Sequence, residues 1–450
     1  MVLRKVKRQL KLLLIAGVLF IVVVSLKLSL DQTNIFLPFD GSVDLSFRQL
    51  LQADMTWTNS RHAHFQLPGR IVEPNGKSNI DPKTTQKPQP LVKISDGYNL
   101  ATRIRDKCAG PASRNSSAKS TARLSLRQPQ LGTYRSGGTE LCIIWKVGTT
   151  FVKRLFMMQK LPKYNNLINP YDISFDEDLQ GQKLSIDASS RFMFVRDPYK
   201  RLVSAYVDKL LAPNPVYWKI ISVKAIRLLR KNATKLSRQC GHDLTFREFI
   251  QYVILTLDAN VLKTPARPDG HFLIQTDICG PCSIKYDFVG KMESFGVDSL
   301  ELMRKMKLTN ETIDLLKKNG SALAAEDAIK DSCHQPFDLG FKKDYLKCLS
   351  FYEALKRAWL KMQMRGLIGP EEMPLTEAQS TTLTLEQFYQ MAMQSRNACP
   401  SPDRNKMQRD HFLKFFATIN AHEMEKIRLI YAQDFNLFEY DDRPSELFHS

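Results

Sequence analysis

The chain has 450 residues, which is long enough for one large domain with appendages or for two domains. Hydrophobic residues make up 43% and charged residues 25%, a composition that excludes a chain disordered throughout. The 65 lysines and arginines outnumber the 46 aspartates and glutamates, and the resulting net charge of +19 indicates an anionic partner. A nucleic acid, a membrane surface, a nucleotide and an acidic polysaccharide all meet that description.

The first thirty residues predict a membrane anchor. Residues 1–11 are basic, and residues 12–26 are apolar without a charge until Lys27. With their flanks they reach about twenty residues, enough for a transmembrane signal anchor over 12–30 behind a cytoplasmic tail. A cleaved signal peptide is the alternative, but no A-x-A-like site follows the apolar run. The remaining chain would then be lumenal, which argues against nucleic acid as the partner.

Two further features fit a lumenal compartment. All eight cysteines follow the apolar run, and an oxidising compartment favours disulfides among them. N-x-[ST] sequons predict N-glycosylation. They occur at Asn115, Asn232, Asn310 and Asn319.

Beyond the anchor, the composition of the chain changes once, near residue 135. Residues 31–134 are rich in turn formers and polar residues and predict a largely disordered stem. Residues 135–445 alternate apolar strand-like and helix-like segments, which predicts an α/β domain with a parallel central sheet and flanking helices. Strands are expected at 141–145, at 191–195 and within 285–293, and helices at 151–160, 199–211, 243–257, 344–362, 385–394 and in 411–435.

The segment WKVGTTFVKRLF (145–156) joins an expected strand to an expected helix. Gly148 allows the backbone to turn closely around a ligand, and Thr149 and Thr150 offer hydroxyls beside free helix N–H groups. Lys146 adds a positive charge. In physical terms this is a phosphate cradle, although it is not a Walker A loop and would by itself often be an ordinary turn.

The segment RFMFVRDPYKRLVSAY (191–206) is a second strand-to-helix junction. Asp197 and Pro198 suit the cap and first position of the following helix, which is a sufficient structural explanation for both. The basic and hydroxyl side chains that remain are Arg196, Lys200, Arg201 and Ser204. Two such anion sites about fifty residues apart suit a ligand with two separated phosphate groups, because strand carboxyl ends are where open α/β sheets bind ligands.

Together, KVGTTFVKR and RDPYKRLVSAY resemble the two cofactor motifs of the Golgi carbohydrate sulfotransferases of the chondroitin, dermatan and glucuronyl type. HFLIQTDICGPCSIKYDFVGKMES (271–294) and IYAQDFNLFEY (430–440) extend the resemblance to roughly residues 138–442. It implies a P-loop-like nucleotide sulfotransferase fold and the co-substrate 3′-phosphoadenylyl sulfate. It also implies a single-pass type II Golgi membrane protein with a lumenal catalytic domain.

The resemblance assigns residues to each end of the co-substrate. The 5′-phosphosulfate would be held by Lys146, Val147, Gly148, Thr149, Thr150, Phe151 and Val152. The 3′-phosphate would be held by the segment from Arg196 to Ser204, with these two residues as its clamp. The family's first loop usually reads P-K-V-x-C-T-N-W-K-R, and this chain departs from it at Trp145, Thr149, Phe151 and Val152. A different acceptor preference or rate is therefore expected, while phosphate binding is preserved in principle.

The catalytic residues expected on this basis are Lys146 and His271. Lys146 would neutralise charge on the bridging oxygen of the leaving phosphate. His271 stands at the position of the family's recurrent histidine and would be the base, since a neutral imidazole accepts a proton near lumenal pH. A purely structural role for His271 is an equal alternative. Glu248 and Asp258 are the next candidates, although Glu248 also fits a helix capping box with Thr245.

The segment Cys279-Gly-Pro-Cys282 also matches the thioredoxin redox motif. It does not open a helix after a strand, and no second C-x-x-C completes a zinc site. Structural disulfides are therefore the favoured interpretation.

The sequence thus predicts a sulfotransferase acting on a glycosaminoglycan or glycoprotein glycan, with an acidic, chondroitin- or dermatan-like acceptor favoured and no metal required. A catalytically inactive protein that binds acidic glycans on the same fold is the alternative. A nucleotide-dependent kinase is disfavoured by the missing Walker loop. The acceptor hydroxyl, the disulfide pairing and the oligomeric state stay open.

Overall fold

The computed structural model describes residues 95–110, 132–174, 177, 179–185, 188–258 and 268–448. The predicted anchor, most of the predicted stem and the sequon at Asn115 lie outside these residues. Within the described part, no helix has the length and apolar character needed to cross a membrane.

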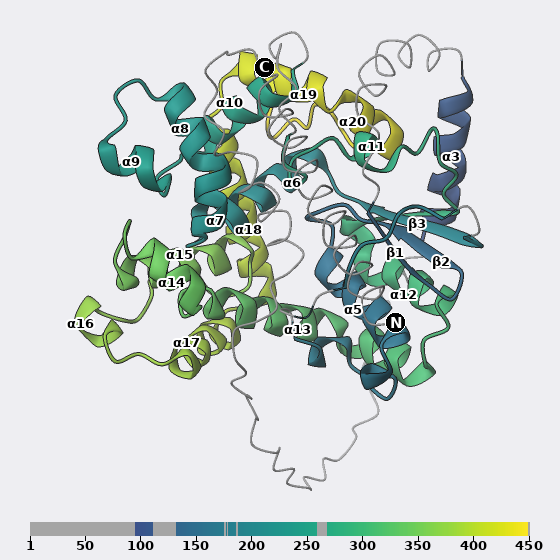
Figure 1. Ribbon diagram of the computed structural model, residues 1–450, viewed down its shortest axis with the longest axis horizontal. Coiled ribbons are helices and arrows are strands. Elements are labelled where there is room, and N and C mark those ends of the chain that lie inside the picture. The colour runs from purple at the N-terminus through teal and green to yellow at the C-terminus, as the bar shows by residue number, and fades with distance from the viewer. Residues whose placement is uncertain are drawn as a thin grey trace, which may run out of the picture. The chain divides into compact units, whose positions relative to one another are not determined.

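A four-stranded sheet carries the two motif loops (Figure 1). Its strands are β1 (Thr133–Ser136), β2 (Thr139–Cys142), β3 (Ser190–Val195) and β4 (Phe288–Lys291), in that spatial order. The β2–β3 and β3–β4 pairs are parallel, as expected from the alternating segments, whereas β1 is an antiparallel edge strand joined to β2 by a tight turn. Both residues of that turn, Gly137 and Gly138, have a positive φ, which glycine adopts without strain.

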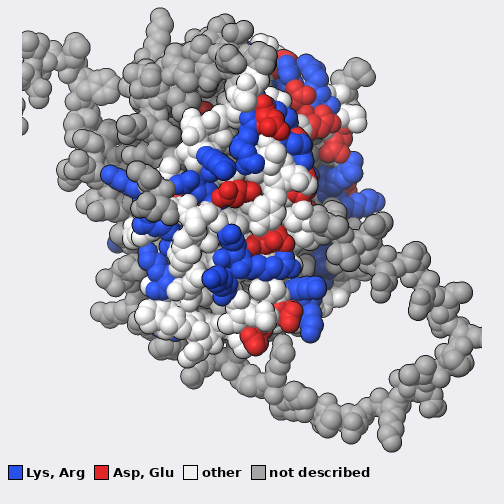
Figure 2. Space-filling model, turned by 90° about the vertical axis from the view of Figure 1, so that its right-hand side faces the viewer, with Lys and Arg blue, Asp and Glu red and all other residues white. Residues whose placement is uncertain are grey.

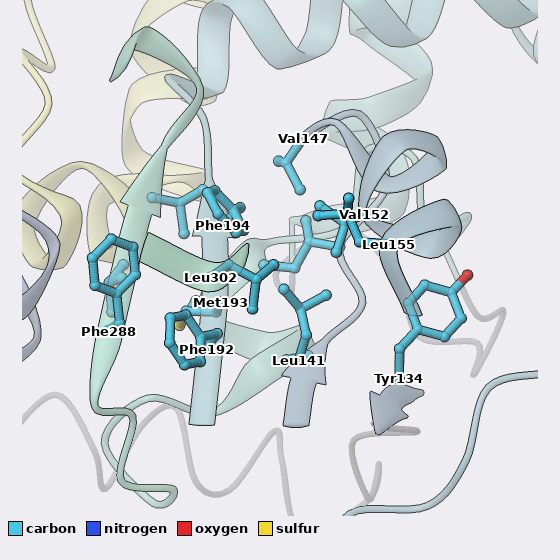
Figure 3. Packing of buried hydrophobic residues seen from close by; sticks show 14 of the residues in the cluster. Tyr134, Leu141, Val147, Val152, Leu155, Phe192, Met193, Phe194, Phe288 and Leu302 are labelled. Carbon is cyan, nitrogen blue, oxygen red and sulfur yellow. The ribbon is translucent and has the colours of Figure 1, made fainter. Parts of the chain in front are cut away.

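The sheet packs against helices that follow its strands. Helices α5 (Thr149–Lys160) and α12 (Phe295–Lys305) contact the edge strands β1 and β4. Figure 3 shows Leu141, Phe192 and Phe288 of the strands meeting Leu155 of α5 and Leu302 of α12 in one buried cluster. The apolar segments predicted as strands and helix therefore form a single core below the motif loops.

Helix α3 (Gly97–Ala109) lies in the range that was predicted as stem. It packs on β4, where a side chain at Gly97 would collide with the Phe288 ring and where Leu100 and Ile104 are buried. A disulfide from Cys108 to Cys282 ties this helix to the domain. The polar composition around α3 hid these few apolar residues, so this part of the range belongs with the sheet.

The other helices form two further cores. One contains α6 (Pro198–Ala205), its π-helical continuation Tyr206–Leu211, α10 (Phe246–Leu257) and α19 (Ala421–Ile430). The other contains α13 (Asn310–His334), α15 (Phe351–Met364) and α17 (Leu385–Ala398). The remaining helices are α7 (Pro215–Tyr217), α8 (Val223–Leu229), α9 (Lys235–Cys240), α11 (Gln275–Cys279), α14 (Leu339–Tyr345), α16 (Glu377–Ser380), α18 (Ser401–Phe416) and α20 (Ala432–Phe438). Shorter helical turns are Pro162–Tyr164, Pro170–Asp172, Trp218–Ser222 and Met292–Ser294.

Caps divide two segments that the sequence pattern presented as continuous. The segment 344–362 breaks at Ser350, whose side chain caps α15, and the segment 411–435 breaks at Asn420, which forms a capping box with Glu423. The capping box predicted for Thr245 and Glu248 is present at the start of α10.

Three disulfides join distant segments: Cys108–Cys282, Cys142–Cys279 and Cys240–Cys348. The two cysteines of the C-G-P-C segment thus bond to different partners, which supports the structural interpretation and excludes a redox pair in this state. Cys333 and Cys399 are buried free thiols.

Of the predicted glycosylation sites within the described residues, Asn232 lies in a turn, and Asn310 and Asn319 lie on α13. All three are exposed. Their glycosylation stays a prediction.

Candidate functional site

The two motif loops meet at the carboxyl ends of β2 and β3. The Arg196 guanidinium donates a hydrogen bond of 3.2 Å to the carbonyl oxygen of Lys146, so the loops are in direct contact. Neighbouring parallel strands bring their carboxyl ends to one edge of a sheet, which is where such folds bind ligands. The structure therefore brings the two motifs together at one edge of the sheet.

Arg201 holds this arrangement together. Its buried guanidinium donates to the carbonyl oxygens of Trp145 at 3.0 Å, Leu273 at 2.7 Å and Gly270 at 2.8 Å. It thereby links the first loop, α6 and the segment before α11. Because these carbonyls occupy its donors, Arg201 has a structural role rather than the ligand-facing one that its place in the motif suggested.

The first loop presents the amino end of α5. Gly148 caps that helix with a φ of 78°, and a side chain there would collide with the Phe295 ring. The first helical amide bond runs from Val152 to Gly148, so the N–H groups of Thr149, Thr150 and Phe151 precede the intrahelical ladder. Free N–H groups and the helix dipole favour an anion at this position.

Most side chains of the first loop point into the protein. Val147, Phe151 and Val152 are buried, and Phe151 packs against the rings of Tyr171 and Phe295. In Figure 3 Val147 and Val152 lie at the top of the buried cluster. These residues can therefore contribute only backbone groups to a ligand.

The two threonines of the loop differ in whether their hydroxyls are available to a ligand. Thr149 donates to the Ile144 carbonyl, whereas Thr150 is exposed at the helix start. The two basic residues that follow, Lys153 and Arg154, turn away to Glu177 and Asp327. Lys146 and Thr150 are thus the side chains of this motif that lie outside the apolar cluster and do not turn away from the loop.

Lys146 lies at the centre of the site. Its φ of 72° is unusual for a residue with a side chain, and its Nζ lies 2.6 Å from Oδ2 of Asp208. Burial lowers the pKa of Lys146 to about 8, against the opposing effect of the Asp208 carboxylate. The ammonium is therefore charged below that pH but close to losing its proton.

Asp208 is shared between two lysines. Its Oδ1 lies 2.9 Å from Nζ of Lys361, a side chain that is only 1% exposed, on α15. Burial alone would raise the pKa of Asp208, but the charges of Lys146 and Lys361 hold it well below its usual value. The Lys361 ammonium also forms an ion pair with Asp331 at 3.3 Å and donates a hydrogen bond to the side chain of Gln335 at 3.2 Å. A buried network thus fixes the carboxylate that contacts Lys146.

The second motif places Arg196 beside this network. The Gln275 side chain bonds both the Arg196 N–H, at 3.0 Å, and its carbonyl oxygen, at 2.9 Å. Burial lowers the pKa of Arg196, although an arginine keeps its charge in proteins. Asp197 caps α6 by accepting from the Lys200 N–H, as predicted. Ser204 is half-buried in the last turn of α6.

His271 lies against the first loop. Its ring stacks on Trp145 at 5.6 Å and meets the Tyr217 ring edge-on at 5.0 Å, and its Nδ1 lies 2.7 Å from Oδ1 of Asp269. Burial lowers the pKa of His271, and Lys146 and Lys209 are near enough to add to that effect. A neutral imidazole held by a carboxylate can accept a proton at its other nitrogen. The same contacts also suit a structural role.

The two reserve candidates for the base are engaged elsewhere. Glu248 receives a two-pronged ion pair from Arg230 besides its capping contacts, and Asp258 is paired with Lys426 at 3.2 Å. His271 is therefore the better placed of the three.

Motif reasoning missed Asp208 and Lys361. Asp208 follows the second motif closely, in the wide π-helical turn, a feature that is frequent at functional sites. Lys361 interrupts the apolar face of α15 that contains Leu355, Ala358 and Met362. A lysine on an otherwise buried helix face was the available signal.

The chain is similar to known proteins over part of its length, including the segment that holds the two motifs. Residues 140–332 match the family model "Sulfotransferase family". The chain is 35% identical over 127 residues to carbohydrate sulfotransferase 8 of Mus musculus, covering 28% of this chain and 29% of that protein. It is 37% identical over 122 residues to carbohydrate sulfotransferase 9 of Homo sapiens, covering 27% and 26%.

A third relative, carbohydrate sulfotransferase 11 of Rattus norvegicus, is 32% identical over 177 residues, which is 36% of this chain and 49% of that protein. The matched segments thus span between about a quarter and a half of these relatives. No solved structure matches the chain significantly. The resemblance predicted from the motifs is confirmed as a similarity: residues 140–332 match the sulfotransferase family model, and the relatives that the chain matches over part of their length are carbohydrate sulfotransferases.

Proposed function

We propose that this protein transfers a sulfuryl group from 3′-phosphoadenylyl sulfate to a hydroxyl of a glycosaminoglycan or glycoprotein glycan, on a P-loop-like nucleotide sulfotransferase fold. The observation that carries the proposal is the contact between two strand-to-helix anion sites through Arg196 and the Lys146 carbonyl. One site has a free helix amino end, and the other has a half-buried arginine. Such a pair suits a nucleotide with two separated anionic groups.

The residues present fit that co-substrate. The amide groups of Thr149 to Phe151, with Lys146, would hold the 5′-phosphosulfate, and Arg196 with Ser204 would hold the 3′-phosphate. When bound, the co-substrate supplies an activated sulfuryl group whose leaving group is a phosphate. Lys146 would stabilise the charge that gathers on that leaving group, because a preorganised cation acts strongly in a water-poor site. Its pKa of about 8 leaves it mainly protonated at neutral pH.

His271 would act on the acceptor. We assign it the removal of the hydroxyl proton while the hydroxyl oxygen bonds to sulfur, with Asp269 holding Nδ1 and leaving Nε2 to accept. The lowered pKa of His271 keeps it neutral near pH 7. Positioning and charge stabilisation would supply most of the remaining rate enhancement.

We further propose a type II protein of the Golgi membrane, anchored by residues 12–30, with an acidic glycan as acceptor. The three disulfides support an oxidising compartment. On the face where α3 lies, basic side chains are spread among acidic ones (Figure 2). The net charge of +19 would thus act as a general attraction, while the buried cations define the site.

The decisive experiment uses the full chain in detergent with sulfur-labelled co-substrate. It is incubated with desulfated chondroitin, desulfated dermatan and a neutral N-glycan oligosaccharide, and disaccharide analysis gives the labelled position. Labelled product that disappears in Lys146→Ala supports the proposal. Glycan binding without any label would instead support the inactive glycan-binding alternative.

A further inference from the structure

Helix α15 ends beside the site. Lys361 reaches Asp208 from this helix, and Asp208 in turn contacts Lys146. The family match stops at residue 332, so α15 is contributed by a part of the chain outside the matched segment. The site therefore has a wall that the two motifs do not describe.

Arg365 stands one turn beyond Lys361 on the same side of α15, because residues four apart on a helix are neighbours. It is the C-terminal cap of α15, and its N–H bonds the Lys361 carbonyl at 3.2 Å. Gly366 follows with a φ of 64°, and the Leu367 N–H bonds the Met362 carbonyl at 3.0 Å. This helix-ending motif fixes the backbone at Arg365.

Arg365 is half-buried as a residue, and no described residue forms a hydrogen bond or ion pair with its guanidinium. It nevertheless lies close enough for its charge to lower the pKa values of both Lys146 and Arg196. Lys209 adds a further cation 3.8 Å from Asp208. Asp208 and Asp331 pair with the lysines of this network, and Glu293 and Asp197 lie near enough to Arg196 to raise its pKa, but among the described residues no carboxylate pairs with Arg365. A half-buried arginine whose guanidinium has no such partner is stabilised by an anionic ligand.

We propose that Arg365 binds a phosphate or phosphosulfate group of the nucleotide, as a third cation beside Lys146 and Arg196. The position of Arg365 relative to those two residues favours the nucleotide over an acidic group of the glycan. Lys361 is a positioning residue in this arrangement, since it acts through Asp208. The inference rests on the proposed function, because it names a further residue for the same nucleotide.

The test measures nucleotide binding without turnover. Full-length wild-type protein and Arg365→Gln are titrated calorimetrically with adenosine 3′,5′-bisphosphate and with adenosine 5′-monophosphate. Arg365→Gln should raise the Kd for the bisphosphate about tenfold or more, the usual effect of losing a hydrogen bond to a charged group. Arg365→Lys, which keeps the charge but not the fork, should lose less. Arg409→Gln is the matched control, because it removes an exposed arginine that pairs with Glu446.

The monophosphate identifies which end of the nucleotide is bound. A weaker Kd for both nucleotides assigns Arg365 to the 5′ group, and a loss confined to the bisphosphate assigns it to the 3′ group; either result supports the proposal. An unchanged bisphosphate Kd in folded Arg365→Gln overturns the proposal. It does so even if the KM for desulfated chondroitin rises in that variant, because Arg365 would then contact the glycan instead of the nucleotide. If Arg365→Gln melts early, the Kd of Arg365→Lys decides by the same criterion. Absence of bisphosphate binding by the wild type would overturn the proposed function itself.

Discussion

The two sides of the site are built differently. The strand-to-helix loop after β2 offers backbone amides beside Lys146, and the loop after β3 offers Arg196; Gly148, Asp197 and Arg201 hold the two loops in place. Helix α15 contributes side-chain charges only, the buried Lys361 and the half-buried Arg365 at its C-terminal cap. The first kind of site is written in adjacent residues and can be recognised as a motif. The second depends on a helix docking from more than a hundred and fifty residues away, so it has no local signature.

The largest effect is expected at Lys146, where the loops and the network of α15 meet. Lys146→Ala should reduce turnover by about 10²–10³, the usual cost of removing a preorganised group that stabilises transition-state charge. Single-turnover measurements with sulfur-labelled co-substrate check this. A folded variant with near-normal turnover would show that the loop amides suffice and that the network around Asp208 is only structural.

His271 tests whether the segment before α11 takes part in chemistry. His271→Ala should lose on the order of a hundredfold in turnover while still binding adenosine 3′,5′-bisphosphate. A structural role would instead reduce thermal stability and nucleotide binding together, because Trp145 and Tyr217 would lose their packing partner. Melting temperature and Kd, measured on the same preparation, separate the two.

The clamp of the second motif, Arg196 and Ser204, allows the contribution of a charged group to nucleotide binding to be compared with that of a hydroxyl. Arg196→Ala should weaken bisphosphate binding about ten- to a hundredfold, and Ser204→Ala about fivefold, because hydrogen bonds to charged donors are the stronger ones. Calorimetric titration gives both values. The assignment of the clamp would have to be withdrawn if folded Arg196→Ala bound the bisphosphate as the wild type does.

Asp208 connects the two sides and predicts a pH effect. Lys146 must be protonated to act, so activity should fall as the pH rises through its pKa of about 8. Asp208→Asn removes the charge that raises this pKa, so the pKa of Lys146 drops and the alkaline fall moves to lower pH, by about one pH unit or more. The pH profile of kcat measures the shift.

One variant serves as the control for that profile. Arg409→Gln lies at an exposed ion pair and should leave the alkaline fall where it is. An alkaline fall at the same pH in Asp208→Asn as in the wild type would mean that Lys146 is not the group that titrates.

Local chemistry was enough for much of this protein. Alternating apolar segments predicted the parallel strands β2, β3 and β4, and the cap residues Asp197 and Thr245 predicted two helix starts. The two motifs predicted strand-to-helix junctions at residues 145–156 and 191–206, and junctions are present there after β2 and β3. These features depend on neighbours in the chain or on the general geometry of sheets.

Other features were settled only by packing between distant segments. Arg201 and Arg196 look alike in the motif. The Arg201 guanidinium, however, donates its hydrogen bonds to three carbonyl groups that come together only in the folded chain. The partners of Cys279 and Cys282, the docking of α3 and the contact of Lys361 with Asp208 likewise join residues more than a hundred positions apart. Composition and periodicity report which residues are buried, but the free energy of burial does not depend on sequence distance, so they cannot report which buried residues touch.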